Sequence, residues 1–384
     1  MQKLLVSLVF LSFISACREE TPVEEAANAP LPPVETDYEE ALIPWGYINT
    51  SGNLVIRAKF DDCRNFQEGL AVVRQGGKWG YINTQGKTVI PVEFRGAFDF
   101  SGGRARVINE AGKSGFIDAA GAVVIPMVYD EAENFQEDRA IVKMQGVYGC
   151  IDRDGQLIIP ISYQYISGFK SGMAKIRENG KYGLIDRHGV PILDPLYDKV
   201  EPYSEGLARF KSKGLFGYLN ADGQVQIPTT FAGCGDFIRG VAPARNNKGW
   251  GLINKSGVWV SPPIYNQMWY AGAGLFVVEK ANKYGYIDTK GIEISLMNYQ
   301  QLQSFKEGLA PYQRDELWGY IDTLGQEVTR PQFGLAWPFA EGMARVIFFE
   351  GMGFIDHHGD PLITPSFLDA RDFSEGLARV QLNY

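Results

Sequence analysis

Short apolar runs recur along this chain, and glycine-rich polar turns separate them. Typical runs are Gly69–Val73, Trp79–Ile82 and Lys87–Ile90. β-Branched and aromatic residues dominate these runs, and no stretch keeps apolar residues at i, i+3, i+4 and i+7 for the length of a helix. The pattern therefore predicts an all-β protein made of short strands joined by tight turns.

The pattern repeats with a period of 34 residues. Eight copies begin with an aromatic residue followed by glycine, at Trp45, Trp79, Tyr148, Tyr182, Phe216, Trp250, Tyr284 and Trp318. Ser114 and Met352 take the aromatic place in the other two copies, and the glycine spacing departs from 34 only between Gly80 and Gly115, where it is 35. We predict ten units over residues 45–384, each a three-stranded meander in the order GLAxV, WGYI, xVIP, followed by a crossing segment to the next unit.

Each position that recurs has a physical role. Asn or Asp stands three residues after the WG glycine in all ten copies, and glycine follows three residues later, as in Asn83 and Gly86. Asx side chains bond to turn backbone and glycine supplies positive φ, so this motif predicts a hairpin turn. Recurring aromatics such as Phe94 and Phe100 are predicted to fill the space between units. Prolines such as Pro91 are predicted to end the third strand of the meander, because a residue without an N–H donor suits a sheet edge or a strand end.

These motifs resemble the WG-repeat family of bacterial proteins, whose consensus runs roughly WGyIDxxGxxVIPxxYxxaxxFxEGLAxV. The resemblance covers nearly all of residues 45–384. It makes Trp45, Trp79, Trp250 and Trp318 structural repeat positions, and it implies no activity, because no family-wide function can be carried over.

Stacked units of this kind form a quasi-one-dimensional array, in which each unit contacts its neighbours. The array starts at Trp45 with no GLAxV strand before it and ends in Gly376–Val380 with no WG strand after it. We predict an open, curved solenoid, because ten units are many to close. The alternative is a closed, propeller-like ring in which the two leftover halves pair.

The N-terminus predicts export. Residues 1–16 combine Lys3 with an apolar run too short to span a bilayer, and Ile14–Cys17 is similar to a bacterial lipobox. We therefore predict a lipoprotein signal peptide, acylation of Cys17 and a cell-envelope location. Arg18 and Glu19 leave no aspartate in second place, which by the sorting rule of enteric bacteria favours the outer membrane. An ordinary secretory signal is the alternative.

Residues 17–44 are predicted to be a disordered tether. They are rich in proline and hold eight acids against one arginine, with few large apolar side chains. Because the whole chain carries a formal net charge of −8, the repeat region is nearly neutral. A neutral body lacks the basic surface that nucleic-acid binding requires.

Catalysis has little support in the sequence. His188 and His358 precede turn glycines, and His357 adjoins the latter. Cys63, Cys150 and Cys234 lack metal-ligand spacing and are predicted to be small buried residues. We expect no enzyme activity, no cofactor and no metal site.

Function in a repeat protein is expected where one copy departs from the others. The largest departure, residues 261–276, contains Trp269 and Tyr270, while Trp259 lies close by and Trp337 shares the phase of Trp269. These four aromatics are the candidate binding residues, although filling the core between units is the alternative role. The sequence thus predicts an envelope-anchored scaffold that binds a protein, peptide or glycan. The alternative is a glycan- or peptidoglycan-active, or wall-binding, enzyme with two acids in a groove.

Overall fold

The computed structural model describes residues 43–295 and 297–382. The predicted signal peptide, Cys17 and the tether up to residue 42 lie outside the described residues. Every element in the described part of the chain is a β-strand, which confirms the all-β prediction. No helix in this part is long and apolar enough to cross a membrane.

The ten repeats form ten small units of antiparallel strands, called blades here, and the last two blades share β37 and so join into one seven-stranded sheet. The predicted GLAxV, WGYI and xVIP strands are the second, third and fourth strands of a blade, in that order. A short first strand, which the sequence analysis assigned to the crossing segment, adds to the free side of the GLAxV strand. Each blade therefore uses the crossing segment of the preceding unit.

The strand bounds follow this scheme. The first strands are β3 (Asp62–Cys63), β7 (Gly96–Ser101), β11 (Glu131–Ala132), β15 (Tyr165–Ile166), β19 (Lys199–Val200), β23 (Gly233–Cys234), β27 (Gln267–Gly272), β30 (Gln301–Leu302) and β34 (Leu335–Ala336). The second strands are β4 (Leu70–Gln75), β8 (Arg104–Ile108), β12 (Ala140–Met144), β16 (Met173–Glu178), β20 (Ala208–Ser212), β24 (Val241–Arg245), β28 (Leu275–Lys280), β31 (Leu309–Arg314), β35 (Ala344–Phe348) and β38 (Leu377–Leu382). The third strands are β1 (Trp45–Asn49), β5 (Lys78–Asn83), β9 (Ser114–Ile117), β13 (Val147–Ile151), β17 (Lys181–Asp186), β21 (Leu215–Leu219), β25 (Trp250–Asn254), β29 (Lys283–Asp288), β32 (Leu317–Asp322) and β36 (Gly351–Ile355). The fourth strands are β2 (Leu54–Phe60), β6 (Thr88–Phe94), β10 (Val123–Tyr129), β14 (Leu157–Tyr163), β18 (Pro191–Tyr197), β22 (Val225–Phe231), β26 (Trp259–Tyr265), β33 (Glu327–Phe333) and β37 (Pro361–Ala370).

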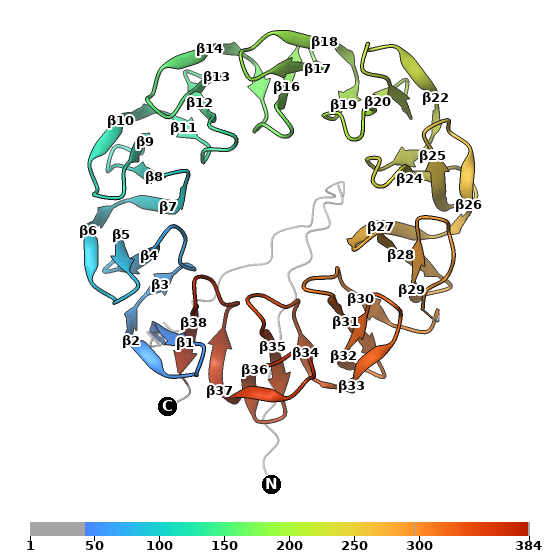
Figure 1. The fold of residues 1–384 in the computed structure, drawn as a ribbon. Coiled ribbons are helices and arrows are strands. Elements are labelled where there is room, and N and C mark those ends of the chain that lie inside the picture. Colours follow the sequence, from blue (N-terminus) through green and yellow to red (C-terminus); the bar gives the residue numbers. More distant parts are fainter. Residues whose placement is uncertain (1–42, 296, 383–384) are drawn as a thin grey trace, which may run out of the picture. The chain divides into compact units, whose positions relative to one another are not determined.

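The repeat region closes into a ring, with blade 1 starting at β3 and blade 10 built from both ends of the chain (Figure 1). Strand β1 pairs with β38, matching Trp45 to Gln381 and Asn49 to Leu377. The same register joins β5 to β4 inside blade 1. The predicted open array is corrected by this pairing, and the alternative, a closed ring, is the observed arrangement.

The closing junction reproduces the contacts made between other blades. The Ser374 hydroxyl donates to the Phe66 carbonyl at 2.7 Å, as the Ser204 hydroxyl does to the Phe237 carbonyl at 2.7 Å. Each blade is rotated by a similar small angle from the one before it. The interface that closes the ring therefore has the same geometry as the other interfaces. The number of units therefore does not oppose closure.

The hydrophobic core is divided into clusters that lie between neighbouring blades. In one cluster Tyr81 and Ile90 of blade 1 pack with Phe100 and Val107 of blade 2, and all four side chains are almost fully buried. The rings of Tyr81 and Phe100 meet edge to face, 5.2 Å apart. The predicted filling of the inter-unit space by aromatics is thus confirmed.

The predicted hairpin turns are present in all ten copies. In the first, Oδ1 of Asn49 accepts from the backbone N–H groups of Ser51 and Asn53, and the other nine Asn or Asp side chains do the same. The glycine of each turn has positive φ, for example +75° at Gly86. These side chains are turn-forming residues.

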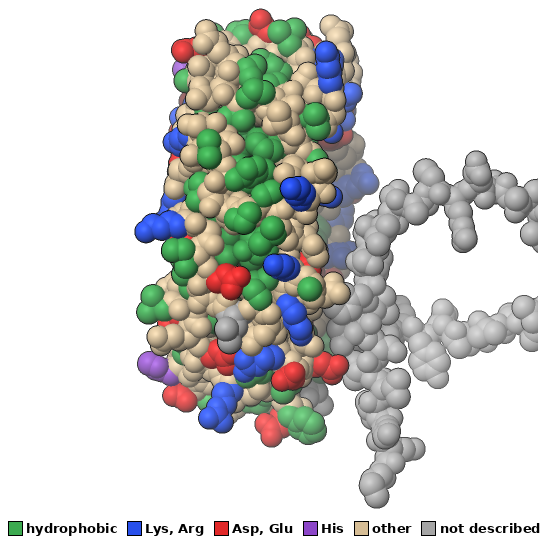
Figure 2. All heavy atoms as spheres, turned by 90° about the vertical axis from the view of Figure 1, so that its right-hand side faces the viewer, with side chains coloured by type: hydrophobic (Ala, Val, Ile, Leu, Met, Phe, Trp, Pro, Cys, Tyr) green, Lys and Arg blue, Asp and Glu red, His purple; other side chains and the backbone are tan. Residues whose placement is uncertain are grey.

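The fourth strands form the rim of the ring, where hydrophobic side chains gather (Figure 2). Proline lies within most of these strands instead of at their ends, which corrects the prediction that proline ends the strand. The other expected place for proline, an edge strand, is observed in most blades. In β6, Pro91 falls in a stretch where the pairing with β5 jumps from Phe94 to Ile90. Because the ladder is already interrupted there, the missing N–H removes no strand hydrogen bond.

Blade 7 departs from this scheme, because its sheet has three strands, β27, β28 and β29. The chain that would form its fourth strand makes only isolated bridges, at Ile287–Glu293 and Tyr284–Tyr299. The first strand of this blade, β27, lies inside the most divergent stretch of the sequence, residues 261–276.

Ring closure can be tested with matched serine variants. We expect Ser374→Ala and Ser204→Ala to lower the free energy of unfolding by similar amounts, about 1 kcal/mol each, because each removes one buried hydrogen bond of the same length. Chemical denaturation measures both. An open ring would make Ser374→Ala neutral and leave the effect of Ser204→Ala in place.

The WG glycine is required by a close backbone approach. A Cβ on Gly80 would lie 2.6 Å from the Pro91 carbonyl oxygen, whereas a Cβ on Gly96 would meet only the tip of the Ile108 side chain, at 3.1 Å. We expect Gly80→Ala to destabilise the protein by about 1–3 kcal/mol. Gly96→Ala, as the control, should cost clearly less in the same denaturation experiment.

Candidate ligand grooves between neighbouring blades

Glutamates at the inner turns link each blade to the next. The loops joining first and second strands point towards the middle of the ring (Figure 1). There the Glu68 carboxylate accepts from the N–H groups of Gly102 and Gly103, at 2.6 and 2.8 Å. Equivalent contacts to the following blade are made by Glu137, Glu205, Glu307, Glu341 and Glu375. The glutamate of the EGLA motif is therefore an inter-blade clasp.

Buried tyrosines of the WGY motif fix the crossing segments. The Tyr81 hydroxyl donates to the Phe98 carbonyl at 2.8 Å, 17 residues further along the chain. Tyr47, Tyr218, Tyr286 and Tyr320 do the same at their own positions. Burial raises the pKa of Tyr81 well above its usual range, so the hydroxyl stays protonated and keeps donating. The crossing segment is thus a fixed wall.

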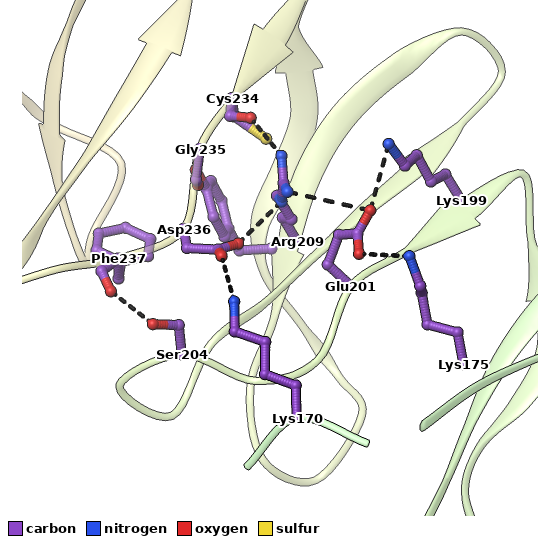
Figure 3. A network of polar contacts seen from close by, with 11 residues as sticks. Lys170, Lys175, Lys199, Glu201, Ser204, Arg209, Cys234, Gly235, Asp236 and Phe237 are labelled. Carbon is purple, nitrogen blue, oxygen red and sulfur yellow. Dashed lines mark hydrogen bonds and ion pairs between the residues drawn. The ribbon is translucent and has the colours of Figure 1, made fainter. Parts of the chain in front are cut away.

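An arginine on the second strand latches several blades to the next (Figure 3). Arg209 donates through Nη1 to the Cys234 carbonyl at 2.9 Å, and its Nε lies 2.9 Å from Oδ1 of Asp236. Arg345 makes the same contacts with Ala370 and Asp372, both at 2.7 Å. These arginines hold the same crossing segments as the tyrosines, since Tyr218 bonds to Gly235 between the two contacts of Arg209.

Further charges surround this latch in Figure 3. Glu201 lies 2.8 Å from Nζ of Lys175 and 3.2 Å from Nζ of Lys199. Burial opposes its ionisation, but the hydrogen bond and charge of Lys175 hold the pKa of Glu201 below its usual value. Nζ of Lys170 lies 3.5 Å from Asp236. Each of the two carboxylates, Glu201 and Asp236, is therefore paired with more than one cation.

Two pockets occupy equivalent places between neighbouring blades. Each is lined by successive crossing segments and by the Trp on the third strand of one blade. One lies between blades 6 and 7 and holds about 280 Å³, between Trp250 and the run Met268–Tyr270. Its other walls are Ile238, Pro243 and the stretch Cys234–Asp236. Pro243 stands here where Arg209 stands in the preceding blade, which makes this pocket mainly apolar.

The other pocket lies at the ring closure and holds about 590 Å³. Its lining is polar and includes Arg64, Asn65 and Asp99 on one side and Arg371, Asp372 and Arg379 on the other. The same fold position therefore carries an apolar groove at one place and a charged groove at another.

The structure separates the four predicted binding aromatics. Trp269 and Tyr270 line the apolar groove together. Trp259 lies on β26 and packs edge to face on Phe231, 5.8 Å between ring centres. Trp337 lies under the guanidinium of Arg345, 4.2 Å from its ring centre. All four side chains are half-buried, so each packs against the protein and also keeps some exposed surface.

The structural tryptophans contact the inter-blade region. Trp45 and Trp318 are buried, at 8% and 4% exposure, while Trp79 and Trp250 are half-buried. Trp45 lies between the guanidinium groups of Arg371 and Arg379, 5.5 and 5.1 Å from its ring centre. Trp250 supports the apolar groove, which the sequence analysis did not foresee.

The cysteines are buried packing residues, and the histidines lie at turns. Cys63, Cys150 and Cys234 are buried and free, as predicted. Burial raises the pKa of Cys234 to about 11. His357 stacks on Phe339, with ring centres 4.3 Å apart, and its Nε2 lies 3.3 Å from Glu307. Over residues 43–295 and 297–382, no three His, Cys, Asp or Glu side chains form a group that could hold a metal ion.

Sequence reasoning missed the glutamate clasp and the arginine latch. Both had a signal in the repeat: an acid in EGLA, and an arginine after the alanine of that motif in Arg209, Arg345 and Arg379. An acid or amide stands at the partner position one blade further on, as at Asp236. The signal was hidden because each partner lies in the next copy.

Comparison with solved structures supports the fold. A crystal structure of the eukaryotic initiation factor aligns with a TM-score of 0.50 and 11% identity, over 77% of this chain and 95% of that one. At that identity the likeness shows the fold alone. BamB from Moraxella catarrhalis aligns with a TM-score of 0.34 and 10% identity, over 85% of this chain and 99% of that one. The WD40 beta propeller domain of Doa1 aligns with a TM-score of 0.28 and 11% identity, over 65% and 90%.

No curated protein matches the sequence significantly. The family model described as WG containing repeat matches ten consecutive segments, residues 45–79, 79–111, 115–148, 148–182, 182–215, 216–250, 250–284, 284–318, 318–347 and 352–384. These segments cover nearly the whole ring and carry the glycines, turn residues and tyrosines described above, and the chain therefore belongs to the WG-repeat family.

Proposed function

We propose that this protein is a non-enzymatic interaction scaffold of the cell envelope, anchored through Cys17, which binds an exposed apolar segment of another protein or peptide. The observation that carries the proposal is the apolar groove between blades 6 and 7. It gathers two tryptophans, a tyrosine and a methionine around one opening. Aromatic residues and methionine are enriched at the centres of protein interfaces, where large side chains enter pockets.

The polar groups of this groove are mostly occupied. The Gly235 carbonyl accepts from the Tyr218 hydroxyl at 2.7 Å, and Asp236 is held by Arg209 and Lys170. A sugar brings many hydroxyl groups that each need a partner. A leucine, methionine or phenylalanine side chain needs none. The groove therefore fits an apolar peptide side chain better than a glycan.

The ring provides rigidity for such contacts. Tyrosine hydroxyls, glutamate clasps and arginine latches fix the crossing segments from three directions, so the groove is largely formed before binding. A preformed site loses less conformational entropy on association than a flexible one. The ligand is expected to bind without a large rearrangement of the ring.

A charge placed in the groove should abolish binding. We expect Ile238→Glu to weaken binding to apolar peptides on a peptide array at least tenfold, because the carboxylate cannot be solvated once a peptide covers it. Ala340→Glu is the matched control, since Ala340 occupies the equivalent turn position three blades further on and makes the same bridge. It should bind like the unaltered protein.

Trp269→Ala provides a second variant, with circular dichroism to establish folding. A glycan array is measured in parallel. Binding to glycans with no binding to peptides would overturn the proposal, as would equal peptide binding by Ile238→Glu and Ala340→Glu. Release of a cleaved product from either array would instead make the protein an enzyme.

A further inference from the structure

The charged groove at the ring closure contains a latch that is only half formed. At two other junctions the second-strand arginine lies against an acid one blade further on: Arg345 against Asp372 at 2.7 Å and Arg209 against Asp236 at 2.9 Å. At the closure the arginine is Arg379 and its counterpart is Asn65. Nε of Arg379 and Oδ1 of Asn65 are both buried, and neither has a hydrogen-bond partner among the described residues.

The substitution of asparagine for aspartate does not by itself break a latch. Between blades 2 and 3, Nε of Arg106 donates to Oδ1 of Asn134 at 3.3 Å. At the closure Nη1 of Arg379 donates to the Cys63 carbonyl, as Arg209 does to the Cys234 carbonyl, and lies 3.7 Å from Asp62, but Nε of Arg379 does not bond to Asn65. The donor and the acceptor thus stay apart, with a cavity beside them.

Two further groups in this groove lack full partners. Oδ1 of Asp99 is buried without a hydrogen bond within the described part of the chain. Nη1 of Arg64 lies 3.8 Å from Oδ2 of Asp99, too far for a hydrogen bond, and its guanidinium otherwise rests on the rings of Phe98 and Trp79. Asp372, in contrast, is already held by Arg345.

The unsatisfied groups have complementary requirements. Arg64 and Arg379 can donate to an anion, while Asp99 and Asn65 can accept from a cation. The lining as a whole holds three arginines and three aspartates, so a ligand with one charge of each sign leaves it balanced. Buried polar groups in native proteins normally find partners. Three buried atoms without one, Nε of Arg379, Oδ1 of Asn65 and Oδ1 of Asp99, belong to the lining of one cavity and indicate a missing ligand.

We propose that the groove at the ring closure binds a small zwitterion, an amino acid or short peptide. Its carboxylate is held by Arg64 and Arg379, and its ammonium group by Asp99 and Asn65. The volume of about 590 Å³ lies within the usual range of small-molecule sites. This site is distinct from the apolar groove, which lies between blades 6 and 7.

Binding at this place is linked to closure of the ring. Arg371 and Arg379 come from the C-terminal end of the chain, whereas Arg64 and Asn65 come from its N-terminal part. The site exists only while β1 and β38 are paired. A ligand that binds only the closed form stabilises it by mass action, in proportion to its concentration relative to Kd.

Isothermal titration calorimetry with alanyl-alanine tests the proposal. Two blocked probes serve as controls: N-acetyl-alanyl-alanine, which lacks the ammonium group, and alanyl-alanine amide, which lacks the carboxylate. We expect the free dipeptide to bind at least ten times more tightly than either blocked form. No detectable binding of the dipeptide, or equal binding of the blocked forms, would overturn it.

Variants locate the site. Arg64→Gln and Asp99→Asn should each weaken dipeptide binding at least tenfold and abolish the rise in melting temperature that the dipeptide causes. Arg177→Gln is the matched control, because Arg177 also rests on an aromatic ring, Tyr182, and lies in blade 4. Trp269→Ala should leave dipeptide binding unchanged, so this site and the apolar groove are tested separately. Unchanged dipeptide binding by Arg64→Gln, or a loss in Arg177→Gln equal to that in Arg64→Gln, would refute the assignment.

Discussion

The structure depends on cores that no single blade completes. Each hydrophobic cluster takes side chains from two neighbouring blades, as Tyr81 of blade 1 and Phe100 of blade 2 show. A lone blade would expose both of its faces, and burying an aromatic side chain of this size contributes roughly 1.5–3 kcal/mol. The free energy of folding therefore comes from contacts between copies, in common with other repeat proteins.

Closure follows from the same constraint. Tyr47 and Ile48, on the first strand of the ring, have no exposed surface. They belong to clusters that Leu377 completes on one side and Ala378 and Val380 on the other. In an open array these side chains would face water at both ends. Pairing β1 with β38 removes two free strand edges as well, and exposed edges are sites of aggregation.

Much of the fold was predictable because its signals are local. The turn motif at Asn83 and Gly86, the strand order and the all-β class follow from residues a few positions apart. The short first strand was not predictable, since Asp62 and Cys63 form it only against Arg74 and Val73. Ring closure could not be decided either, because curvature depends on how blades pack and the sequence period is the same for an open or a closed array.

The candidate sites, too, were predictable only where their signals are local in the sequence. A departure from the repeat singled out Trp269 and Tyr270, which line one groove, and their role in binding stays a prediction. It could not show that Trp337 is engaged by Arg345, because that contact depends on the three-dimensional position of a second-strand residue. The charged groove was missed altogether, since its walls come from opposite ends of the chain.

The arrangement separates stability from recognition within each repeat. Positions that face the cores, such as Tyr81 and Phe100, must be large and apolar, because every interface requires the same volume. The second-strand position occupied by Arg209, Pro243 and Arg379 faces a groove, and the backbone accepts each of these residues there. Proline in place of arginine at this position replaces a latch by an apolar wall, whereas Arg209 and Arg379 differ in the partner that the next crossing segment offers, Asp236 or Asn65. A ring of near-identical units can in this way carry chemically different grooves at fixed distances, without altering the interfaces that hold it closed.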